Sequence, residues 1–545
     1  MWRAARLAFN FLLPAVVFTA AILILILLMN PSVTVSGAKL PFIFLDLFLF
    51  YGPLSFAAMA IIFAIVQFFS ERRYPIGIVN PPTPTYILFF TILIVSVVLY
   101  ANYDYYGEFF AASTRSKFFI TLMLNFLLVV LGLVFLFSRR SRQVWLQALF
   151  LVVLAGSGFI AGRTILPVSP ATTEIKHPSR FPPPALDTPR KIRIVIMDGL
   201  SLNLLFDLGG EQKLLNFNWI MENGGHGRIS TFKPNQELAL VNTLLSGYTP
   251  AEYGTHSEYK YRFRDAAGEF DIFPRYIFFR LSSHLGLVSF YKQTAPAFND
   301  QLQGHYLASG QETFRMLRPD PPPTYAPRNL ERNGAFIQFF SDALKKKDPK
   351  LEILKKAFFY DDYVKKLIPE VKASTGSRIG YALVSLEGLK TITNYFLQYS
   401  RPDLYGNLDE EEIQRYGSLV EKYYDYYDSI VGNLISTTGD DEMLVIMSFY
   451  EFEPLPVWRR ALVKYFGRKD VFVYKPLNAL GTILVYEKAA LKKGYDLNTV
   501  SVYDLFPTLL YYAGFPLPKK LKGEVVKDMF NDYFLANNPV YFQID

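Results

Sequence analysis

The sequence predicts an α/β domain with a mostly parallel sheet flanked by helices, preceded by an α-helical membrane domain of about five spans. Long apolar runs dominate the first 168 residues, and a proline-rich stretch follows them. From Lys191 to the end of the chain, strand and helix patterns alternate, as in a parallel sheet covered by helices. We therefore expect a transmembrane domain over residues 1–168, a linker over 169–190 and an extracytoplasmic domain over 191–545.

The composition excludes several kinds of site. Cysteine is absent from the 545 residues, so neither a disulfide framework nor a thiolate metal site can form. The net charge of +8 is modest for this length, and the basic residues stand in short loops between apolar runs rather than along one face. We therefore expect no nucleic-acid partner.

The apolar runs of the first domain are each near the roughly 20 residues that a bilayer-spanning helix requires. They cover Phe11–Met29, Phe48–Phe69, Tyr86–Ala101, Phe118–Phe137 and Val144–Ile160. The second run could begin at Leu40, but Asp46 and Gly52-Pro53 favour a first part that is interfacial or broken. Few charges lie within the runs, which makes a transporter a weaker interpretation of this domain.

Basic residues in the short loops predict the orientation. One side, which we assign to the cytoplasm, carries Arg3, Arg6, Arg72, Arg73, Arg139, Arg140 and Arg142, and the other carries Lys39, Arg115 and Lys117. An odd number of spans then places everything after Arg163 outside the cytoplasm. The first run could instead be a cleaved signal peptide, but its apolar core is too long and no clean small-x-small site follows, which favours an uncleaved anchor.

The stretch from Thr164 to Arg190 is rich in proline and polar residues. Such a composition predicts an extended, semi-rigid spacer that holds the next domain away from the membrane. The run Pro182–Pro184 could also recruit a proline-binding module, although the spacer is the simpler interpretation.

The stretch that begins at Lys191 organises the second domain. Residues 192–197 form a continuous apolar run, typical of a strand buried on both faces, and it ends at Asp198-Gly199. Because functional groups in open α/β sheets gather at the carboxyl ends of strands, Asp198 stands where a metal ligand or catalytic acid would be. Its alternative role is to cap the Gly199 turn.

Two helices should follow this strand. The first has Leu215 and Trp219 four residues apart and should stop at Gly224-Gly225, before a loop. The second should have Asn235 as its N-cap and run to Ser246-Gly247. A strand, an acidic turn and a helix N-terminus are a common way to assemble a phosphate site.

Later elements continue the alternation. Apolar strands are expected at Arg378–Leu386, Met443–Ser448 and Gly481–Tyr486, with a long helix at about Glu410–Ile435. The segment Thr255–Asn329 is less regular.

Three short segments carry a family resemblance. MDGLS at 197–201, ENGGHGR at 222–228 and SGYTPAEYG at 246–254 resemble the opening of the type I phosphodiesterase and nucleotide pyrophosphatase branch of the alkaline phosphatase superfamily. The likeness continues to about residue 530, where VYDLFPTLLYYAGFPLP is similar to the closing segment of that family. The resemblance implies an alkaline phosphatase-like fold with two divalent metals, usually zinc, held by three Asp and three His around a Thr or Ser nucleophile.

Most of the site implied by the resemblance has changed. Asp198 matches the first metal ligand, whereas the nucleophile position falls on Glu237. The remaining ligand positions fall on Glu387, Thr391, Phe449, Tyr450 and Leu477. All three ligand histidines of the family should follow residue 305, but the five histidines are His177, His226, His256, His284 and His305. We therefore expect a site that has lost its nucleophile and its zinc ligands.

Acidic residues remain near these positions, namely Asp198, Glu237 and Glu387, with Glu451 and Glu453 nearby in sequence. They suit a hard cation such as Mg²⁺, Mn²⁺ or Ca²⁺ rather than Zn²⁺. The alternative is structural, because Glu237 stands in the first turn of a helix, where a negative charge is favourable, and Glu387 could lie on a loop. We favour the structural role and expect no cofactor.

Other candidate groups are weaker. Ser448 and Tyr450 could in principle act as nucleophiles, but a neutral hydroxyl without a metal or base is a poor one. His226 and His256 could act together as general bases, although a loop or capping role is expected for His226. In the tyrosine clusters at 423–428 and 509–515 we expect one residue of each pair in the core and its neighbour at the rim, rather than a stacking surface for ligands.

The sequence therefore favours a membrane-anchored pseudoenzyme with a phosphodiesterase-like domain. It would bind a phosphorylated or glycan ligand, or serve as a partner subunit of an envelope enzyme in lipid or polymer metabolism. The plan of five spans and an outer domain resembles that of lipoteichoic acid synthases and phosphoethanolamine transferases in layout alone. The alternative hypothesis is an active metal-dependent phosphodiesterase or phosphotransferase with a rebuilt carboxylate site.

Overall fold

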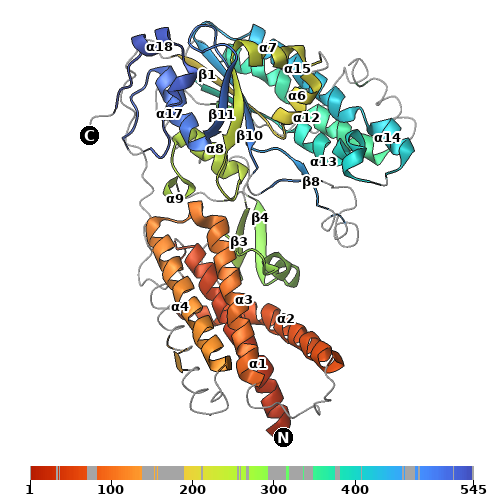
Figure 1. Cartoon of the computed structure of the whole chain (residues 1–545), viewed down its shortest axis with the longest axis vertical. Coiled ribbons are helices and arrows are strands. Elements are labelled where there is room, and N and C mark those ends of the chain that lie inside the picture. Colours follow the sequence, from red (N-terminus) through yellow and green to blue (C-terminus); the bar gives the residue numbers. More distant parts are fainter. Residues whose placement is uncertain are drawn as a thin grey trace. The chain divides into compact units, whose positions relative to one another are not determined.

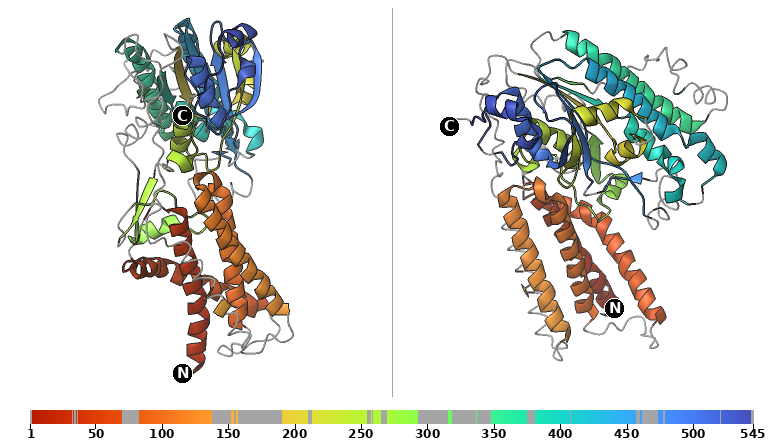
Figure 2. Two further views of the ribbon diagram at one scale, coloured as in Figure 1. Left: turned by 90° about the vertical axis from the view of Figure 1, so that its left-hand side faces the viewer. Right: turned by 45° about the horizontal axis from the view of Figure 1, so that its top comes forward.

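The chain was analysed as a computed structural model (Figures 1 and 2). The structure describes residues 2–31, 37–69, 83–137, 190–209, 213–253, 259–264, 269–292, 315–317, 348–374, 381–406, 408–456, 473–476, 479–519 and 521–542, with a few isolated residues between these ranges.

The chain forms two compact units, and the division does not follow the linker alone. Residues 1–176 together with 250–295 form one unit, here called the helical unit. Residues 177–249 together with 296–545 form the other, here called the sheet domain. The segment Pro250–Ala295, called the insertion, thus leaves the sheet domain and packs with the helical unit. The sequence analysis had placed it in the domain that follows the linker.

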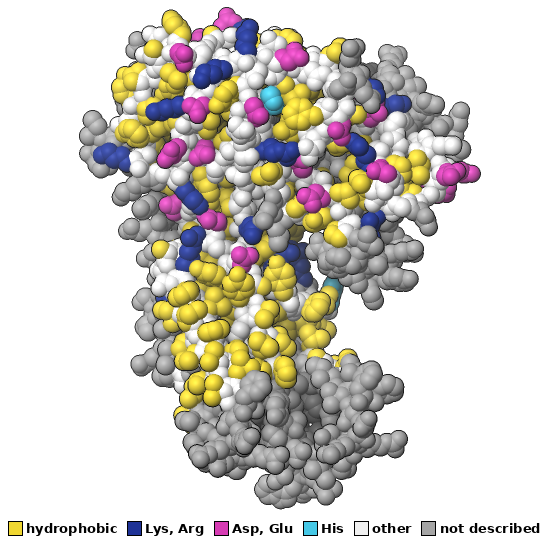
Figure 3. Space-filling model, viewed as in Figure 1, with side chains coloured by type: hydrophobic (Ala, Val, Ile, Leu, Met, Phe, Trp, Pro, Cys, Tyr) yellow, Lys and Arg dark blue, Asp and Glu magenta, His cyan; other side chains and the backbone are white. Residues whose placement is uncertain are grey.

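The helical unit contains the long helices α1 (Trp2–Met29), α2 (Leu40–Phe69), α3 (Thr83–Tyr106) and α4 (Ala112–Phe137). Within the described residues, four helices are long and apolar enough to cross a membrane, at Leu12–Met29, Leu40–Ala58, Leu88–Phe109 and Ala112–Val134. Hydrophobic side chains cover much of the visible face of this unit (Figure 3). The unit therefore belongs to a membrane protein.

Two expectations about the spans have different outcomes. The break expected at Gly52-Pro53 is wrong, because α2 continues through Pro53 as one helix. Long apolar helices tolerate proline in this way when neighbouring groups compensate for the lost hydrogen bond. The span expected at Val144–Ile160 lies almost entirely outside the described residues.

The insertion has a small aromatic core. It contains α9 (Pro250–Tyr253), β3 (Tyr259–Phe263), the 3₁₀ helix η2 (Phe279–Leu285) and β4 (Val288–Lys292), and β3 pairs with β4 in antiparallel register. Tyr261, Phe263, Phe270 and Phe279 are buried against one another between these elements. Aromatic packing of this kind stabilises a segment that is too short to form a core of its own.

The sheet domain is built on seven strands in the order β11-β2-β10-β7-β1-β6-β5. Their bounds are β1 Lys191–Met197, β2 Gly225–Ser230, β5 Arg315–Leu317, β6 Tyr381–Leu386, β7 Glu442–Ser448, β10 Gly481–Tyr486 and β11 Tyr495–Ser501. β1 is parallel to both β6 and β7, while β10 runs antiparallel to β7 and β2. The sheet is therefore mixed, with mainly parallel pairing, and the antiparallel β10 was not predicted.

Helices cover both faces of this sheet (Figure 1). One layer contains α6 (Leu202–Gly209), α7 (Leu215–Asn223), α12 (Pro349–Ser374), α13 (Gly388–Ser400) and α15 (Leu419–Ser436), which share one buried core with alternate residues of the central strands. The other face packs against α8 (Glu237–Ser246) and α17 (Val502–Ala513). Strands that are covered on both sides account for the continuous apolar runs in the sequence.

The remaining described elements are short. They are η1 (Gly107–Phe109), η6 (Pro402–Leu404), α14 (Glu410–Tyr416), η7 (Lys527–Met529), α18 (Asp532–Asn537) and a two-stranded ribbon of β8 (Glu453–Pro454) and β9 (Val473–Tyr474).

Most elements predicted for this domain are confirmed, with local differences. The helix expected at Glu410–Ile435 is divided into α14 and α15 at Gly417, whose carbonyl accepts a hydrogen bond from the Ser400 hydroxyl at 2.6 Å. In α7, Leu215 is 70 % exposed, and the buried face is formed by Phe217, Ile220 and Met221. The N-cap of α8 is Gln236 rather than Asn235.

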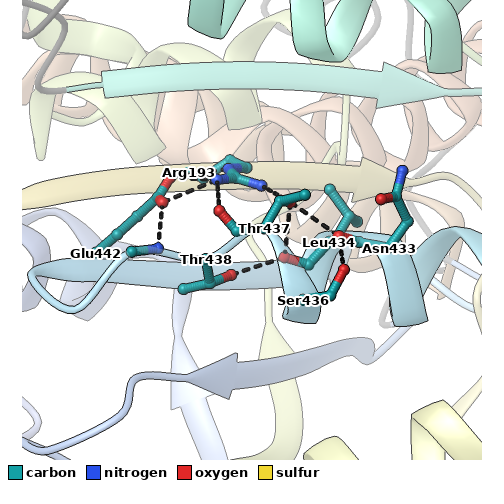
Figure 4. A network of polar contacts seen from close by, with 8 residues as sticks. Arg193, Asn433, Leu434, Ser436, Thr437, Thr438 and Glu442 are labelled. Carbon is teal, nitrogen blue, oxygen red and sulfur yellow. Dashed lines mark hydrogen bonds and ion pairs between the residues drawn. The ribbon is translucent and has the colours of Figure 1, made fainter.

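A buried ion pair fastens the amino end of β1, which is the end away from Asp198. Arg193 donates to both carboxylate oxygens of Glu442 at 2.8 Å and to the Thr437 side chain and carbonyl at 3.0 and 3.2 Å (Figure 4). Glu442 also accepts from the backbone of Gly439 at 2.9 Å. Because every polar group of the pair is bonded, it joins β1 to the turn between α15 and β7 without leaving an unpaired charge.

Candidate functional site

The candidate site begins at the carboxyl end of β1. Asp198 is fully buried there, and its backbone N–H donates to the Leu386 carbonyl at the end of β6. The next residue, Gly199, has a φ of +85°, and a Cβ atom at this position would lie 3.1 Å from the Cα of Lys390. A glycine is therefore required both for the conformation of the turn and for the close approach of α13.

Ser448 holds this turn in place. Its hydroxyl accepts a hydrogen bond from the Gly199 N–H at 3.1 Å and donates to the Tyr450 carbonyl at 2.8 Å. Both hydrogen-bonding directions of the hydroxyl are thus used within the protein. The arrangement supports a structural role and gives no support to Ser448 as a nucleophile.

Lys390 lies between the two carboxylates that the sequence placed at the site. Its Nζ is 3.6 Å from Oδ2 of Asp198 and 3.9 Å from Oε2 of Glu237. The lysine side chain is 33 % exposed, whereas the side chains of Asp198 and Glu237 are 0 % and 10 % exposed. One ammonium group therefore lies near two buried or nearly buried carboxylates. Asp198 follows the carboxyl end of β1, and Glu237 is the first residue of α8.

The carboxylate of Asp198 has an unusual environment. Neither of its oxygens accepts a hydrogen bond from any described residue. Burial, and then the nearby carboxylate of Glu237, raises the pKa of Asp198 to about 7, while the Lys390 ammonium opposes the shift. Glu387 adds to the increase and Lys475 opposes it, so both residues belong to the same electrostatic cluster.

Glu387 and Thr391 stand at the start of α13, which follows β6, the strand paired with β1. Glu387 is the N-cap residue of α13, so the loop position considered for it becomes the start of a helix. The Thr391 hydroxyl donates to the Glu387 carbonyl at 3.4 Å, which is a bond within the helix itself. Asp198, Glu237 and Glu387 are thus gathered in one region, and Thr391 contributes its hydroxyl to the helix backbone.

The backbone N–H groups at the start of α13 are held by a residue that the sequence did not single out. Asp361 of α12 is fully buried and accepts hydrogen bonds from the backbone N–H groups of Glu387 and Gly388, both at 3.1 Å. Its second oxygen accepts from the hydroxyls of Tyr423 and Tyr427 at 2.7 and 2.8 Å. Asp361 thereby fixes the start of α13 and, through it, the position of Lys390.

The other positions implied by the resemblance carry bulky side chains. Phe449 and Tyr450 follow β7 and are both buried. The Nζ of Lys475 lies 3.6 Å from the centre of the Tyr450 ring and donates to the Asn235 carbonyl at 2.6 Å. Tyr450 thus presents its ring face to a second ammonium group, a favourable cation–π geometry. Leu477 lies outside the described residues.

The two further glutamates have local structural roles. Glu451 accepts hydrogen bonds from the Leu202 N–H at 2.9 Å and the Ser201 hydroxyl at 3.0 Å, and so caps α6. It also lies 3.5 Å from an Arg228 nitrogen. Glu453 accepts from the Tyr474 hydroxyl at 3.1 Å, which joins β8 to β9.

The histidine and tyrosine expectations are only partly met. His226 lies in strand β2 rather than in a loop, and its ring meets that of Phe206 edge to face at 5.9 Å. His256 lies outside the described residues. In the tyrosine clusters, Tyr423, Tyr424, Tyr426, Tyr427, Tyr511 and Tyr512 are all buried. The expected division into core and rim is therefore wrong for these pairs, because neighbouring elements cover both members. For example, Tyr426 packs on Phe358 of α12, and Tyr511 and Tyr512 both pack on Phe534 of α18.

Comparison with known proteins adds little to this geometry. No family model matches the chain, and no curated protein matches it. Among solved structures, murine ectonucleotide pyrophosphatase/phosphodiesterase 5, an inactive variant in complex with AMP, shares 11 % identity over 63 % of this chain and 100 % of its own, with a TM-score of 0.35. The human protein shares 12 % identity over the same fractions, with a TM-score of 0.34.

Proposed function

We propose that the sheet domain is a phosphodiesterase-like pseudoenzyme in which Lys390 supplies the positive charge that a metal ion would otherwise supply. The main support for this proposal is that the Lys390 ammonium lies within 4 Å of the carboxylates of both Asp198 and Glu237. These two positions match the first metal ligand and the nucleophile of the family that the sequence resembles. A cation built into the chain would satisfy the carboxylates without any metal.

The donors that surround the site do not fit a pair of zinc ions. Zinc favours imidazole nitrogen, and the three positions that match the family's histidines hold Thr391, Tyr450 and Leu477. No group of three or more His, Cys, Asp or Glu in the described part of the chain is arranged to hold a metal ion. A divalent ion between Asp198 and Glu237 would also lie beside the Lys390 ammonium, where repulsion between like charges is unfavourable.

The role that follows is binding rather than turnover. The Lys390 side chain is 33 % exposed, and we propose that its ammonium also binds an anionic group such as a phosphate. We propose that the domain binds a phosphorylated or glycan ligand, or an envelope protein partner, as an accessory subunit in cell-envelope lipid or polymer metabolism.

One observation favours a second candidate function. Both oxygens of the buried Asp198 accept no hydrogen bond from the described residues, as in a carboxylate that awaits a cation. An active phosphodiesterase or phosphotransferase would then use Asp198, Glu237 and Glu387 to hold Mg²⁺, Mn²⁺ or Ca²⁺. This alternative requires Lys390 to move away from the carboxylates.

The metal content of the full-length protein, purified in detergent, separates the two candidates. We expect no stoichiometric divalent metal and no hydrolysis of a chromogenic phosphodiester in the presence of Mg²⁺, Mn²⁺ or Zn²⁺. Saturable binding of glycerol phosphate that is weakened in Lys390→Gln would support the ligand role. A stoichiometric metal and a turnover that both disappear in Asp198→Ala would establish the active enzyme instead.

We further propose that the chain crosses the membrane five times, with the N-terminus in the cytoplasm. The insertion contacts the carboxyl-terminal ends of α1 and α3, at Asn30 and Asn102, so these two helices cross in the same direction. The helix α4 starts near this end and runs back to Phe137. A further crossing, for which the sequence predicts Val144–Ile160, would bring the chain to the side of the insertion. The positive-inside pattern supports the orientation.

Labelling of single cysteines tests this topology, and the absence of native cysteine makes the test direct. We expect an impermeant maleimide to label Tyr533→Cys in intact expressing cells, because Tyr533 is 80 % exposed in α18. Arg139→Cys, which follows α4, should be labelled only after lysis. Labelling of both positions from the same side would contradict the fifth crossing.

A further inference from the structure

The insertion is fastened to the end of α1 by one asparagine. The Asn30 side chain, which follows the last residue of α1, donates to the Ile272 carbonyl at 2.6 Å and accepts from the Ile272 N–H at 3.0 Å. This pair of bonds imitates the pairing of two strands. Asn30 also donates to the Tyr261 hydroxyl at 3.3 Å, and both side chains are buried.

A second asparagine repeats this arrangement at the end of α3. Asn102 donates to the Arg275 carbonyl at 3.1 Å and accepts from the Arg275 N–H at 2.9 Å. The Tyr106 hydroxyl donates to the Phe273 carbonyl at 3.0 Å, and the Arg275 guanidinium both bonds the Tyr105 hydroxyl and lies over its ring. Residues 272–275 are therefore held at the ends of two helices that qualify as membrane spans.

These contacts fix the level of the insertion relative to the bilayer. The apolar segment Leu12–Met29 ends one residue before Asn30, and the segment Leu88–Phe109 contains Asn102 in its last part. A span of this length ends where the hydrocarbon gives way to the headgroups. The chain that follows Arg275 thus starts at the membrane surface.

Apolar side chains of the next ten residues remain uncovered. Tyr276 is 57 % exposed, Phe278 69 %, Leu281 49 % and Leu285 60 %. Phe278 and Leu281 are three residues apart at the start of the 3₁₀ helix η2, where side chains three residues apart lie one above the other, and Leu285 is the last residue of this helix. We call these four residues the apolar face of the insertion.

Two of these exposed residues have a strained backbone conformation. Tyr276 and Phe278 have φ values of +70° and +56°, a conformation that non-glycine residues rarely adopt. A bulky residue remains in this strained conformation only when its surroundings compensate for it. Tight anchoring of Phe273 and Arg275 on α3 provides that compensation, and it leaves both aromatic side chains exposed.

Basic residues border the apolar face. Arg275 lies over the Tyr105 ring at 4.4 Å, and Arg280 lies over the Phe273 ring at 4.8 Å and the Tyr259 ring at 5.6 Å. The ring of Tyr276 meets that of the buried Tyr105 edge to face at 6.4 Å, so the face adjoins the carboxyl-terminal end of α3. Aromatic residues beside arginines are the composition found where proteins meet the boundary between lipid headgroups and acyl chains.

We propose that the apolar face of the insertion enters the outer interfacial layer of the bilayer, with Tyr276, Phe278, Leu281 and Leu285 in contact with lipid. The lipid is the occupant that suits this surface, because the face begins at the ends of two spans and is bordered by aromatic and arginine side chains. The insertion is then a monotopic anchor that lies in the membrane plane, beside the helices that cross it.

Nitroxide labels on the full-length protein in nanodiscs of phosphatidylcholine with a minor share of phosphatidylglycerol test this proposal. Single labels at Phe278→Cys, Leu281→Cys and Leu285→Cys are compared with Val97→Cys in α3, which is 60 % exposed, and Tyr533→Cys in the sheet domain. We expect the three labels in the insertion to collide with oxygen more than with an aqueous nickel chelate, as at Val97→Cys. The label at Tyr533→Cys should show the reverse.

Fluorescence quenching of an introduced tryptophan is a control that needs no nitroxide label, which could itself draw the segment toward lipid. In Phe278→Trp, brominated lipid should reduce the added tryptophan fluorescence several-fold more than an aqueous quencher does. Nickel accessibility at positions 278, 281 and 285 equal to that at 533 would overturn the proposal. Exclusion of both relaxing agents, together with spin–spin broadening between copies, would also overturn it and identify a second chain as the occupant.

Discussion

Replacing Asp361 with alanine is expected to destabilise the sheet domain by at least about 3 kcal/mol. The change would leave two buried tyrosine hydroxyls and two backbone N–H groups at the start of α13 without their shared acceptor. Thermal unfolding of the full-length protein in detergent should shift down by about 6–12 °C.

The neighbouring residue provides a matched control. Asp362 pairs with Lys366 at 2.8 Å on α12, where the aspartate and lysine side chains are 19 % and 50 % exposed. Asp362→Ala should change the unfolding free energy by no more than about 0.5 kcal/mol. Equal effects of the two substitutions would show that the hydrogen bonds of Asp361 do not govern the stability of this region.

Asp361→Asn removes the titrating group at nearly constant shape, although its amide nitrogen replaces one of the two accepting oxygens with a donor. Burial raises the pKa of Asp361 from 3.8 to about 7, although the bonds from Tyr423, Tyr427 and the two amides oppose the shift. The folded state therefore keeps a proton that the unfolded state releases, and stability falls as the pH rises from about 4 to about 7. The slope from this group is about 1.4 kcal/mol per pH unit. The asparagine variant should lose this part of the pH dependence, and an unchanged profile would contradict the shifted pKa.

Replacing Lys390 with glutamine is expected to create a binding site for divalent cations. The substitution would leave Asp198 and Glu237 facing each other, near Glu387, without the ammonium that lies 3.6 and 3.9 Å from the first two. Oxygen donors in such an arrangement suit Mn²⁺, Mg²⁺ or Ca²⁺. A cation at about 100 times its dissociation constant would add about 2.7 kcal/mol to the unfolding free energy. The melting temperature of the variant should then rise by about 5–10 °C on addition of the cation.

The wild type and a surface lysine serve as controls for this result. Wild-type protein should show no such rise, since its own ammonium already lies close to both carboxylates and would repel a divalent cation. Lys213→Gln removes an ammonium that lies 2.6 Å from Glu421 in a largely exposed pair, and it should behave like the wild type. A cation effect of equal size in the wild type, or none in Lys390→Gln, would contradict the idea that Lys390 substitutes for a metal.

The central strands could be predicted, but not all of their directions. The apolar run at 192–197 and the bounds of β10 agree with the sequence analysis, because a strand buried on both faces needs a continuous apolar run. That run looks the same whichever way the strand points. The antiparallel β10 therefore left no trace in the pattern of Gly481–Tyr486.

Two residues that change the interpretation of the site, Lys390 and Asp361, could not be identified from the sequence. Lys390 stands one residue before Thr391, so a comparison restricted to family ligand positions passes over it. Asp361 is 26 residues from Glu387, and no periodicity relates an acidic residue on one helix to the start of another. Similarly, the Ser400 hydroxyl that ends α14 at Gly417 comes from α13, and only the folded chain brings them together.

A water-soluble sheet domain cannot be prepared by cutting the chain at its linker alone. A fragment that starts at Lys191 would still carry Pro250–Ala295, and its segment around Ile272 would lose the asparagines of α1 and α3 that it pairs with. Recombinant production would require that segment to be excised as well. The insertion also affects the order in which the sheet is synthesised. The ribosome makes β1 and β2 before residues 250–295, and it makes their sheet neighbours β6, β7, β10 and β11 after them. We therefore expect the growing chain to reach the bilayer surface a second time before the sheet is complete.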